Sequence, residues 1–284
     1  MKSSVTPFNV ARSSLGLALL LPSVAFAQAV SYDTAGASYT QNFDSLGSTG
    51  AAWSNGTTIT GWHWVGETGT TPSVYNATNA SGANPNQVLS LGNSSDRAFG
   101  GQNGNGVATL YFGAQILNST GDALSSFTLT YTGEQWRAIA NESNDGLTFQ
   151  YQIFDAGMGS LSAASGWTAV GDLNFTAPRT VSSSTGLNGN LDENRVTSIS
   201  STVLGLTWSD GQEIWLRWAD NNPVSNSSSS LRAAMGIDDL SFSAVSASAV
   251  PEPSSFAMIF GVLSLGFVSC RRRRRIGAAE DMGC

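Results

Sequence analysis

The sequence is poor in charged residues and contains a single histidine. Only 12% of its 284 residues are charged, against about 25% in a typical soluble domain. Because His63 is the only histidine, any site that needs two histidine ligands, or a catalytic histidine elsewhere, is excluded. Low charge does not indicate disorder here. The chain has eight Trp, thirteen Phe and six Tyr residues, and disordered chains lack the aromatic residues that build a core.

Cysteine is nearly absent. Both cysteines, Cys270 and Cys284, lie near the C-terminal end. Residues 28–249 therefore have none, which excludes disulfides, cysteine nucleophiles and cysteine-ligated metals from that stretch. An apolar core alone can stabilise a stretch of this length, because a domain of about 200 residues buries roughly 70% of the surface of its unfolded chain.

Basic residues are few and are gathered towards the ends of the chain. The whole chain has 13 basic and 20 acidic residues, a net charge of −7. Residues 28–249 keep six arginines and no lysine against 17 acidic residues, a net charge of −11. Nucleic acid binding needs a concentrated basic surface. Nucleic acid is therefore excluded as a partner, and cations or neutral glycans are favoured.

The N-terminal residues have the pattern of a secretory signal. Lys2 and Arg12 give the first residues a positive charge, like the n-region of a signal peptide. Residues 15–21 are apolar but too few to span a bilayer. Ala25-Phe26-Ala27 has the small-x-small form of a cleavage site. The pattern predicts a signal peptide over residues 1–27. The alternative is a buried N-terminal helix.

The C-terminal residues have three parts in order. Pro251-Glu252-Pro253 is followed by an uncharged apolar stretch over residues 256–269, and then by an arginine cluster. Arginines beside a membrane span stay cytoplasmic, so the order predicts a single apolar membrane helix with the body on the far side and a short tail, residues 276–284. An arginine run standing alone would instead be a solvated tail or a nucleic acid patch. The cluster consists of Arg271, Arg272, Arg273, Arg274 and Arg275.

This arrangement over residues 250–275 closely resembles the PEP-CTERM sorting signal of Gram-negative bacteria. The resemblance implies export through the Sec translocon, removal of the leader by signal peptidase, and recognition by an exosortase that cuts near Pro251-Glu252-Pro253. It also implies transient residence in the inner membrane, then delivery to the cell surface or the extracellular matrix, where such proteins are associated with exopolysaccharide and biofilm. The sequence departs from the family in its longer tail, residues 276–284.

Residues 28–249 alternate short apolar-patterned runs with clusters of Gly, Asn, Ser and Asp. Residues 126–132 and 147–153 alternate with period two, and Asn144-Asp145-Gly146 between them predicts a hairpin turn. No stretch shows a helical period. We therefore expect one all-β domain, an antiparallel jelly-roll-like β-sandwich. Further expected strands are 39–43, 57–65, 88–91, 107–112, 167–170, 196–199, 213–218 and 236–245, with a long loop over 221–230.

The two ends of this body resemble the jelly-roll domains of bacterial surface proteins and carbohydrate-binding modules. The resemblance rests on Gln41-Asn42-Phe43-Asp44 near the start and on residues 236–242 near the end. The middle, over residues 127–137, 173–175 and 216–220, resembles a domain that recurs among PEP-CTERM proteins. These resemblances imply a jelly-roll fold and no shared activity, and no hydrolase activity carries over.

Asp238 is a candidate metal ligand. Strand alternation puts it on the same face as Leu240 and Phe242, so it points inward if that face meets the core. An inward carboxylate needs a cation, an arginine or several N–H donors. The resemblance to jelly-roll modules implies a structural Ca²⁺ held by Asp238 together with Asp44, and oxygen ligands suit that ion.

Two other interpretations of Asp238 stay open. Its carboxylate could close a turn through hydrogen bonds, or it could pair with Arg217 or Arg232.

Trp136 and Arg137 are candidate ligand-binding residues. In the run Glu134-Gln135-Trp136-Arg137 a ring beside charged groups could stack on the C–H face of a sugar. The alternative places Trp136 in the core, since Trp is highly buried on average, with Glu134 paired to Arg137 or Arg217.

Trp62 and Trp64 form a second candidate. In Trp62-His63-Trp64 the two rings share one face of a strand and His63 takes the other. They could stack on a glycan, or they could be core residues with His63 on the solvent side.

No motif for chemistry stands out. The sequence has no nucleophile elbow, phosphate loop, dinucleotide fingerprint or zinc motif. The 17 acidic residues within residues 28–249 allow too many pairs for a glycosidase dyad to be recognised. We therefore expect a non-enzymatic surface or matrix protein that binds exopolysaccharide. A surface hydrolase acting on glycans or proteins and a purely structural coat protein are the alternatives.

Overall fold

The computed structural model describes residue 1 and residues 28–66, 69–82, 84–104, 109–140, 145–221 and 231–247. The predicted signal peptide, the sorting signal with its apolar helix, and the tail lie outside the described residues. No helix among the described residues is long and apolar enough to cross a membrane.

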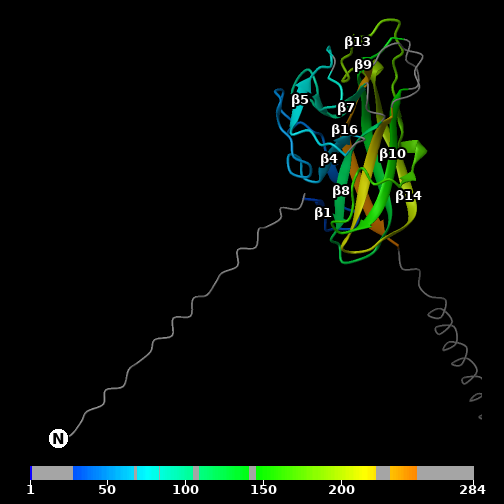
Figure 1. Ribbon diagram of the computed structural model, residues 1–284. Coiled ribbons are helices and arrows are strands. Elements are labelled where there is room, and N and C mark those ends of the chain that lie inside the picture. The colour runs from blue at the N-terminus through cyan, green and yellow to red at the C-terminus, as the bar shows by residue number, and fades with distance from the viewer. Residues whose placement is uncertain are drawn as a thin grey trace, which may run out of the picture.

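The described chain is all-β, as the alternation predicts. Its helical elements are the 3₁₀ turns η1 (Gly171–Leu173) and η2 (Asp192–Asn194). The strands form two sheets, and Figure 1 shows the long strands β8, β9 and β10 running along the length of the body.

The first sheet has seven strands. Its central order is β1-β8-β15-β10-β11, with β4 paired to β8 and β12 paired to β10. The bounds are β1 (Val30–Tyr32), β4 (Trp62–Gly66), β8 (Thr109–Asn118), β10 (Gly146–Asp155), β11 (Thr168–Ala169), β12 (Phe175–Thr176) and β15 (Gln212–Asn221).

The second sheet has nine strands. Its central order is β13-β9-β16-β7-β6-β5-β3, with β14 paired to β9 and β2 paired to β16. The bounds are β2 (Tyr39–Gln41), β3 (Ala51–Ala52), β5 (Val74–Thr78), β6 (Val88–Leu91), β7 (Ala98–Gly104), β9 (Leu124–Ala138), β13 (Thr185–Gly186), β14 (Arg195–Trp208) and β16 (Leu231–Ser246).

Two features correct the expected topology. The sheets are mixed rather than wholly antiparallel, because β1 pairs with β8 and β5 with β6 in parallel. The predicted hairpin is also wrong: β9 belongs to the nine-stranded sheet, and β10 pairs with β15 in the other sheet. The Asp145 carboxylate accepts hydrogen bonds from the backbone N–H groups of Gly146 and Ala233, so it ties the start of β10 to β16 instead of closing a hairpin.

The main core fills the space between the sheets and is rich in aromatic residues. The Trp218 ring, on β15, lies 5.1 Å from that of Phe149 and 5.3 Å from that of Tyr131 between ring centroids. It also stacks on Trp62 at 6.1 Å. Tyr131 belongs to the nine-stranded sheet and the other three residues to the seven-stranded sheet. Burial and edge-to-face packing of such rings therefore hold the two layers together.

Candidate functional site

The outer face of the seven-stranded sheet carries a polar site with a cavity beside it. On β15 the side chains of Ile214, Leu216 and Trp218 enter the core. Because side chains alternate along a strand, Glu213, Trp215 and Arg217 take the outer face. All three are nevertheless buried, because the loop between β10 and β11, residues 156–167, covers them. We call this segment the covering loop.

His63, on β4, joins this face from the side. Its Nε2 lies 3.0 Å from Oε1 of Gln115 on β8, and its ring centroid lies 4.7 Å from that of Trp215. With the amide oxygen as acceptor, the ring proton sits on Nε2 and Nδ1 is an acceptor, with no hydrogen bond to any residue that the structure describes. Burial lowers the pKa of His63 to about 4, and the hydrogen bond that its ring donates to Gln115 opposes that shift only in part. The imidazole is therefore neutral at pH 7.

Glu213 holds the covering loop and orients the tryptophan. Its Oε1 accepts a hydrogen bond from the backbone N–H of Gly157 at 3.1 Å. Its Oε2 accepts one from Nε1 of Trp215 at 3.2 Å. Both oxygens are thus engaged within the protein, which fits a positioning role for this carboxylate.

The covering loop packs directly on the Trp215 ring. A Cβ placed on Gly159 would lie 2.0 Å from Trp215 Nε1, so only glycine allows this approach. Beyond it, Leu161 packs against Val65 and Trp215 in a small apolar cluster. The loop therefore forms one wall of the site and the sheet forms the other.

Arg217 fixes the far end of the loop. Its guanidinium donates to the backbone carbonyl oxygen of Leu161 at 2.7 Å and to the side-chain oxygen of Gln150 at 3.0 Å. Burial lowers the pKa of Arg217 to about 10, and the neighbouring Tyr111 opposes that shift. The side chain therefore stays cationic at pH 7.

Between loop and sheet lies a cavity of about 570 Å³. Its lining combines apolar surface with amides, hydroxyls and an imidazole, and Glu213 is the one carboxylate among its described lining residues. Such a lining can both donate hydrogen bonds to ligand hydroxyl groups and accept hydrogen bonds from them, while its apolar side chains pack against C–H groups. The lining consists of Asn55, His63, Val65, Gly69, Thr71, Gln115, Ala156, Gly157, Gly159, Ser160, Leu161, Ser162, Glu213 and Trp215.

The tryptophans expected to stack on a glycan lie elsewhere. Trp62 and Trp64 are 0% and 1% exposed and face the core, where Trp62 Nε1 donates to the hydroxyl of Tyr39 at 2.9 Å. A stacking platform needs an exposed ring face, so the expectation that these two rings bind a ligand is wrong. The alternation itself is confirmed, because His63 lies on the opposite face, where it lines the cavity.

The second predicted platform is also corrected. Trp136 is 0% exposed and packs in a smaller apolar cluster on the outer face of the nine-stranded sheet. Its Nε1 donates to Oε2 of Glu134 at 2.8 Å, so the hydrogen-bond partner of Glu134 is Trp136 rather than Arg137 or Arg217. Arg137 donates instead to the backbone carbonyl oxygens of Ala80 and Ser81 at 3.1 and 2.9 Å.

The expected orientation of Asp238 is wrong for a local reason. The pairing of β16 with β9 shifts by one residue between Asp238 and Ser241, and Asp239 has φ of 48°. This bulge puts Ile237 and Leu240 in the core and Asp238 on the outer face.

The pairing of Asp44 and Asp238 as metal ligands stays a prediction. Asp44 accepts hydrogen bonds from the backbone N–H of Arg97 and the amide of Asn42, so both of its oxygens have partners within the protein. No group of three His, Cys, Asp or Glu side chains in the described ranges could hold a metal ion. The alternative pairing of Asp238 with Arg217 is excluded, because Arg217 lies on the other sheet.

Sequence reasoning missed the residues that line the cavity. Gln115, Glu213 and Trp215 were not singled out, although residues 213–218 were expected to form a strand. The available signal was the alternation itself, which puts Glu213, Trp215 and Arg217 on one face of β15. The covering loop had no comparable signal.

Comparisons with known proteins give limited similarity. Neither a protein-family model nor a curated protein sequence matches this chain. Among solved structures, it is similar to TmCBM61, determined in complex with β-1,4-galactotriose, with 8% identity, a TM-score of 0.27, and 55% of this chain and 79% of that chain covered. It is also similar to the CBM22-1 xylan-binding domain of Xyn10C from Paenibacillus barcinonensis, with 10% identity, a TM-score of 0.29, and 76% and 100% covered.

Proposed function

We propose that this protein is a non-enzymatic glycan-binding protein and that the cavity between β15 and its covering loop binds a neutral saccharide. The cavity itself carries this proposal. Its volume of about 570 Å³ falls in the range of about 300–1,000 Å³ typical of small-ligand sites, and its lining matches the two kinds of surface that a sugar presents.

The polar groups suit hydroxyl recognition. Gln115 and Ser160 offer amide or hydroxyl groups, and the neutral His63 offers an acceptor at Nδ1. The amide of Asn55 is already engaged with Trp53, Trp64 and Thr71. Val65 and Leu161 provide apolar contact for ring C–H groups. A net charge of −11 over residues 28–249 disfavours anionic polymers, so a neutral glycan is the better fit.

The geometry favours binding over hydrolysis. A glycosidase places two carboxyl groups on either side of the scissile bond, roughly 5–10 Å apart. The described lining contributes only Glu213, and both of its oxygens are engaged with Gly157 and Trp215. A serine hydrolase needs a histidine oriented by a carboxylate, and His63 is held instead by the neutral amide of Gln115.

Binding is tested with the purified full-length chain on a panel of neutral polysaccharides, including β-1,4-galactan and xylan, beside a polyuronate. We expect retention on a neutral member and none on the polyuronate. Gln115→Ala should weaken that binding roughly tenfold, because it removes one hydrogen-bonding group and leaves His63 unpaired. Thr202→Ala, on the exposed face of β14, is the matched control. Retention on no member, or equal affinity of both variants, contradicts the proposal.

We further propose that the chain reaches the cell surface or matrix by exosortase sorting. The support is the order of Pro251-Glu252-Pro253, apolar stretch and arginine cluster, together with the N-terminal signal pattern. Such a route would place the cavity among exopolysaccharides. Deleting residues 251–275 should release unprocessed protein into the medium, and unchanged localisation of the deletion variant would refute this route.

A further inference from the structure

Strand β14 forms a long free edge of the nine-stranded sheet. It has 14 residues and pairs with β9 along one side. On its other side no strand of the described chain pairs with it. Within the described ranges, no backbone-to-backbone hydrogen bond joins residues 196–207 to anything but β9. The N–H and C=O groups on the outer side of β14 are therefore available to another strand.

The other outermost strands of the two sheets are short. Each has between two and five residues, and short edge strands are one of the ways in which proteins avoid edge-to-edge association. At 14 residues, β14 lacks that protection. The short outermost strands in the described chain are β1, β2, β3, β4, β11, β12 and β13.

The middle of β14, residues 199–204, has the composition of a strand that pairs readily. We call it the edge segment. It runs in regular register with β9 between two irregularities, and left-handed residues bound it, Ser198 with φ of 57° and Gly205 with φ of 75°. The segment contains no charged residue, proline or glycine, and three of its residues are β-branched. Segments of about six residues with this composition are prone to add to other strands.

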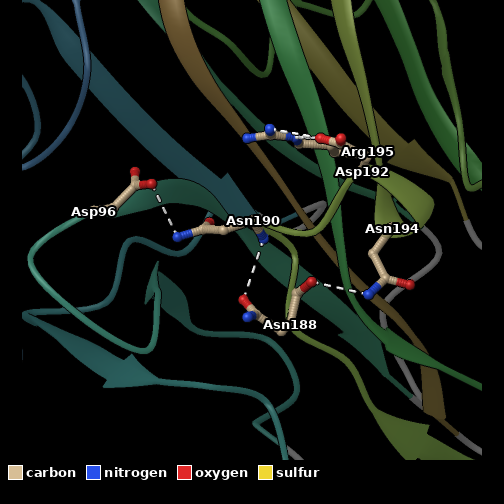
Figure 2. Close-up of polar contacts among 6 residues, drawn as sticks. All are labelled: Asp96, Asn188, Asn190, Asp192, Asn194 and Arg195. Atoms are coloured by element: carbon tan, nitrogen blue, oxygen red, sulfur yellow. Dashed lines mark hydrogen bonds and ion pairs between the residues drawn. The ribbon is translucent and has the colours of Figure 1, made fainter.

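No charge protects the edge segment. β14 begins at Arg195, whose guanidinium pairs with Asp192 at 2.7 Å. Figure 2 shows this pair at the start of the strand, beside the loop that Asn190 ties to Asp96. Residues 196–208 include no charged residue. Charged side chains are a common guard on edge strands, and without them two copies of the segment meet no like-charge repulsion where they touch.

The two faces of the edge segment differ in character. On the inner face Ile199 and Val203 pack against the main core. On the outer face Ser200 and Thr202 are exposed, and their hydroxyls bond to hydroxyls of β9 at 2.7 and 2.8 Å. The 3₁₀ turn η1 lies near β14, but Ser201 and Val203 remain partly exposed, so the edge is open to solvent. A pairing strand must therefore match an apolar row on one face and a hydroxyl row on the other.

We propose that β14 is a self-association edge, and that the edge segments of two copies pair antiparallel about a two-fold axis at Ser201. Residues directly opposite each other in an antiparallel pair lie on the same face of the sheet. With the axis at Ser201, Ser200 lies opposite Thr202 of the second copy, and Ile199 lies opposite Val203. Hydroxyl meets hydroxyl on the outer face, and apolar side chain meets apolar side chain on the inner face.

This register is the self-complementary one. An axis at Thr202 would set Ser200 opposite Leu204, and an axis at Ser200 would set Ile199 opposite Ser201. Each of these places a hydroxyl against an apolar side chain. Because a single two-fold register matches both rows at once, a second copy of this chain is the occupant that the edge fits. A two-fold contact of this kind is closed and stops at the dimer.

Such a dimer would present its two glycan cavities on one side. The two-fold axis stands perpendicular to the joined sheet, so equivalent faces of the two copies point the same way. Two sites that face one polysaccharide can bind it together, which raises avidity without a new contact. The pairing itself does not rest on the glycan proposal, so either can fail without the other.

The test measures the oligomeric state of the full-length chain by sedimentation velocity, in a mild detergent that shields the apolar residues 256–269. We expect a concentration-dependent equilibrium between monomer and dimer, because so small a contact is weak. A chain that stays monomeric at concentrations up to about 1 mM would overturn the proposal. Open-ended oligomers would also overturn it, since a two-fold contact cannot form them.

Variants assign the contact to β14. Thr202→Lys places like charges on both sides of the axis and should weaken the dimer about tenfold or more. Thr202→Ala adds no charge and should dimerise as the wild type does. Thr128→Lys is the matched control, because Thr128 lies opposite Thr202 on β9, one strand in from the edge. Equal weakening by the two lysine substitutions, or none by Thr202→Lys, would contradict the assignment.

Ser201→Cys tests the register through a gain rather than a loss. At the axis the two introduced thiols lie opposite each other, with Cα atoms about 4.5–5.5 Å apart, which suits a disulfide. Oxidation should join residue 201 of one copy to residue 201 of the other, as peptide mass spectrometry would show. Ser243→Cys, on β16 and away from the edge, should give no such link. Dimers of Ser201→Cys that are joined only through Cys270 or Cys284 would refute the register.

Discussion

The guanidinium of Arg217 lies over the Trp167 ring at 3.8 Å from the ring centroid, and over the Tyr111 ring at 4.4 Å. A buried cation is thus held between two aromatic faces rather than by a carboxylate. Cation–π contacts of this kind are worth about 2 kcal/mol when desolvated. Since Trp167 belongs to the covering loop and Tyr111 to β8, the stack joins the loop to the sheet beside the cavity.

Replacing Arg217 should loosen the loop and weaken glycan binding. Arg217→Lys keeps the charge but loses the planar fork that reaches Gln150 and Leu161. We expect a loss of about 2–3 kcal/mol of stability and a several-fold weaker affinity, measured by chemical unfolding and by polysaccharide binding. Arg179→Lys, at an exposed position, is the control. If both variants bind equally well, Arg217 does not position the loop.

Gly159 offers a sharper test of the loop wall. Gly159→Ala places a Cβ where Trp215 Nε1 already lies, so loop and ring must separate. Overpacking of this kind costs about 1–3 kcal/mol, and we expect glycan binding to fall at least tenfold because the cavity changes shape.

Gly171→Ala is the matched control for Gly159→Ala, since no atom lies within 4 Å of its added Cβ. The two variants are compared in thermal melts and in binding isotherms. Wild-type affinity in Gly159→Ala would mean that the wall formed by this loop takes no part in recognition.

The neutral state of His63 predicts a defined pH dependence. Its pKa is about 4 in the fold and about 6.5 when unfolded, so the unfolded chain binds more protons between these values. The contribution of His63 to the free energy of unfolding is therefore fully present above pH 6.5 and is lost as the pH falls towards 4. At pH 5 about 2 kcal/mol of it has been lost. Glu213 is the other titratable side chain among the described lining residues, and no charged residue faces His63 from β8 or the covering loop.

Comparing melts of the wild type and His63→Gln isolates this contribution, since Glu134 and Asp238 titrate in both. Between pH 7 and pH 5 the free energy of unfolding of the wild type should fall by about 2 kcal/mol more than that of His63→Gln. Glycan affinity at 25 °C should stay level between pH 5.5 and 8, because the imidazole remains neutral there. A difference that is constant with pH would show that His63 is not shielded from protonation.

The sequence pattern predicted the strands better than it predicted how they join. Alternation located β9, β10, β15 and β16, and it correctly opposed His63 to Trp62 and Trp64. It missed the bulge at Asp239, because a left-handed residue inside a strand leaves no mark on period two. The Asp145-Gly146 signal was misleading, since Asp145 bonds to Ala233 on another strand.

The candidate sites were harder to foresee than the fold. The cavity forms where residues 156–162 close on β4, β8 and β15. It depends on a loop path fixed by individual contacts, such as that of Gly159 with Trp215. Strand periodicity carries no information about such contacts, so it left open whether Trp62, Trp64 and Trp136 bind a ligand or pack inside, and the structure buries all three.

Trp62 tests that correction directly. The ring is wholly buried and packs against Phe43 at 4.6 Å and Trp218 at 6.1 Å between centroids. Trp62→Ala should cost about 3–5 kcal/mol of stability through the cavity that it leaves. Trp62→Phe should cost less, and should bind glycan as the wild type does at temperatures where it stays folded. Loss of glycan binding by a fully folded Trp62→Phe chain, with unfolding unchanged, would restore Trp62 as a ligand-binding residue.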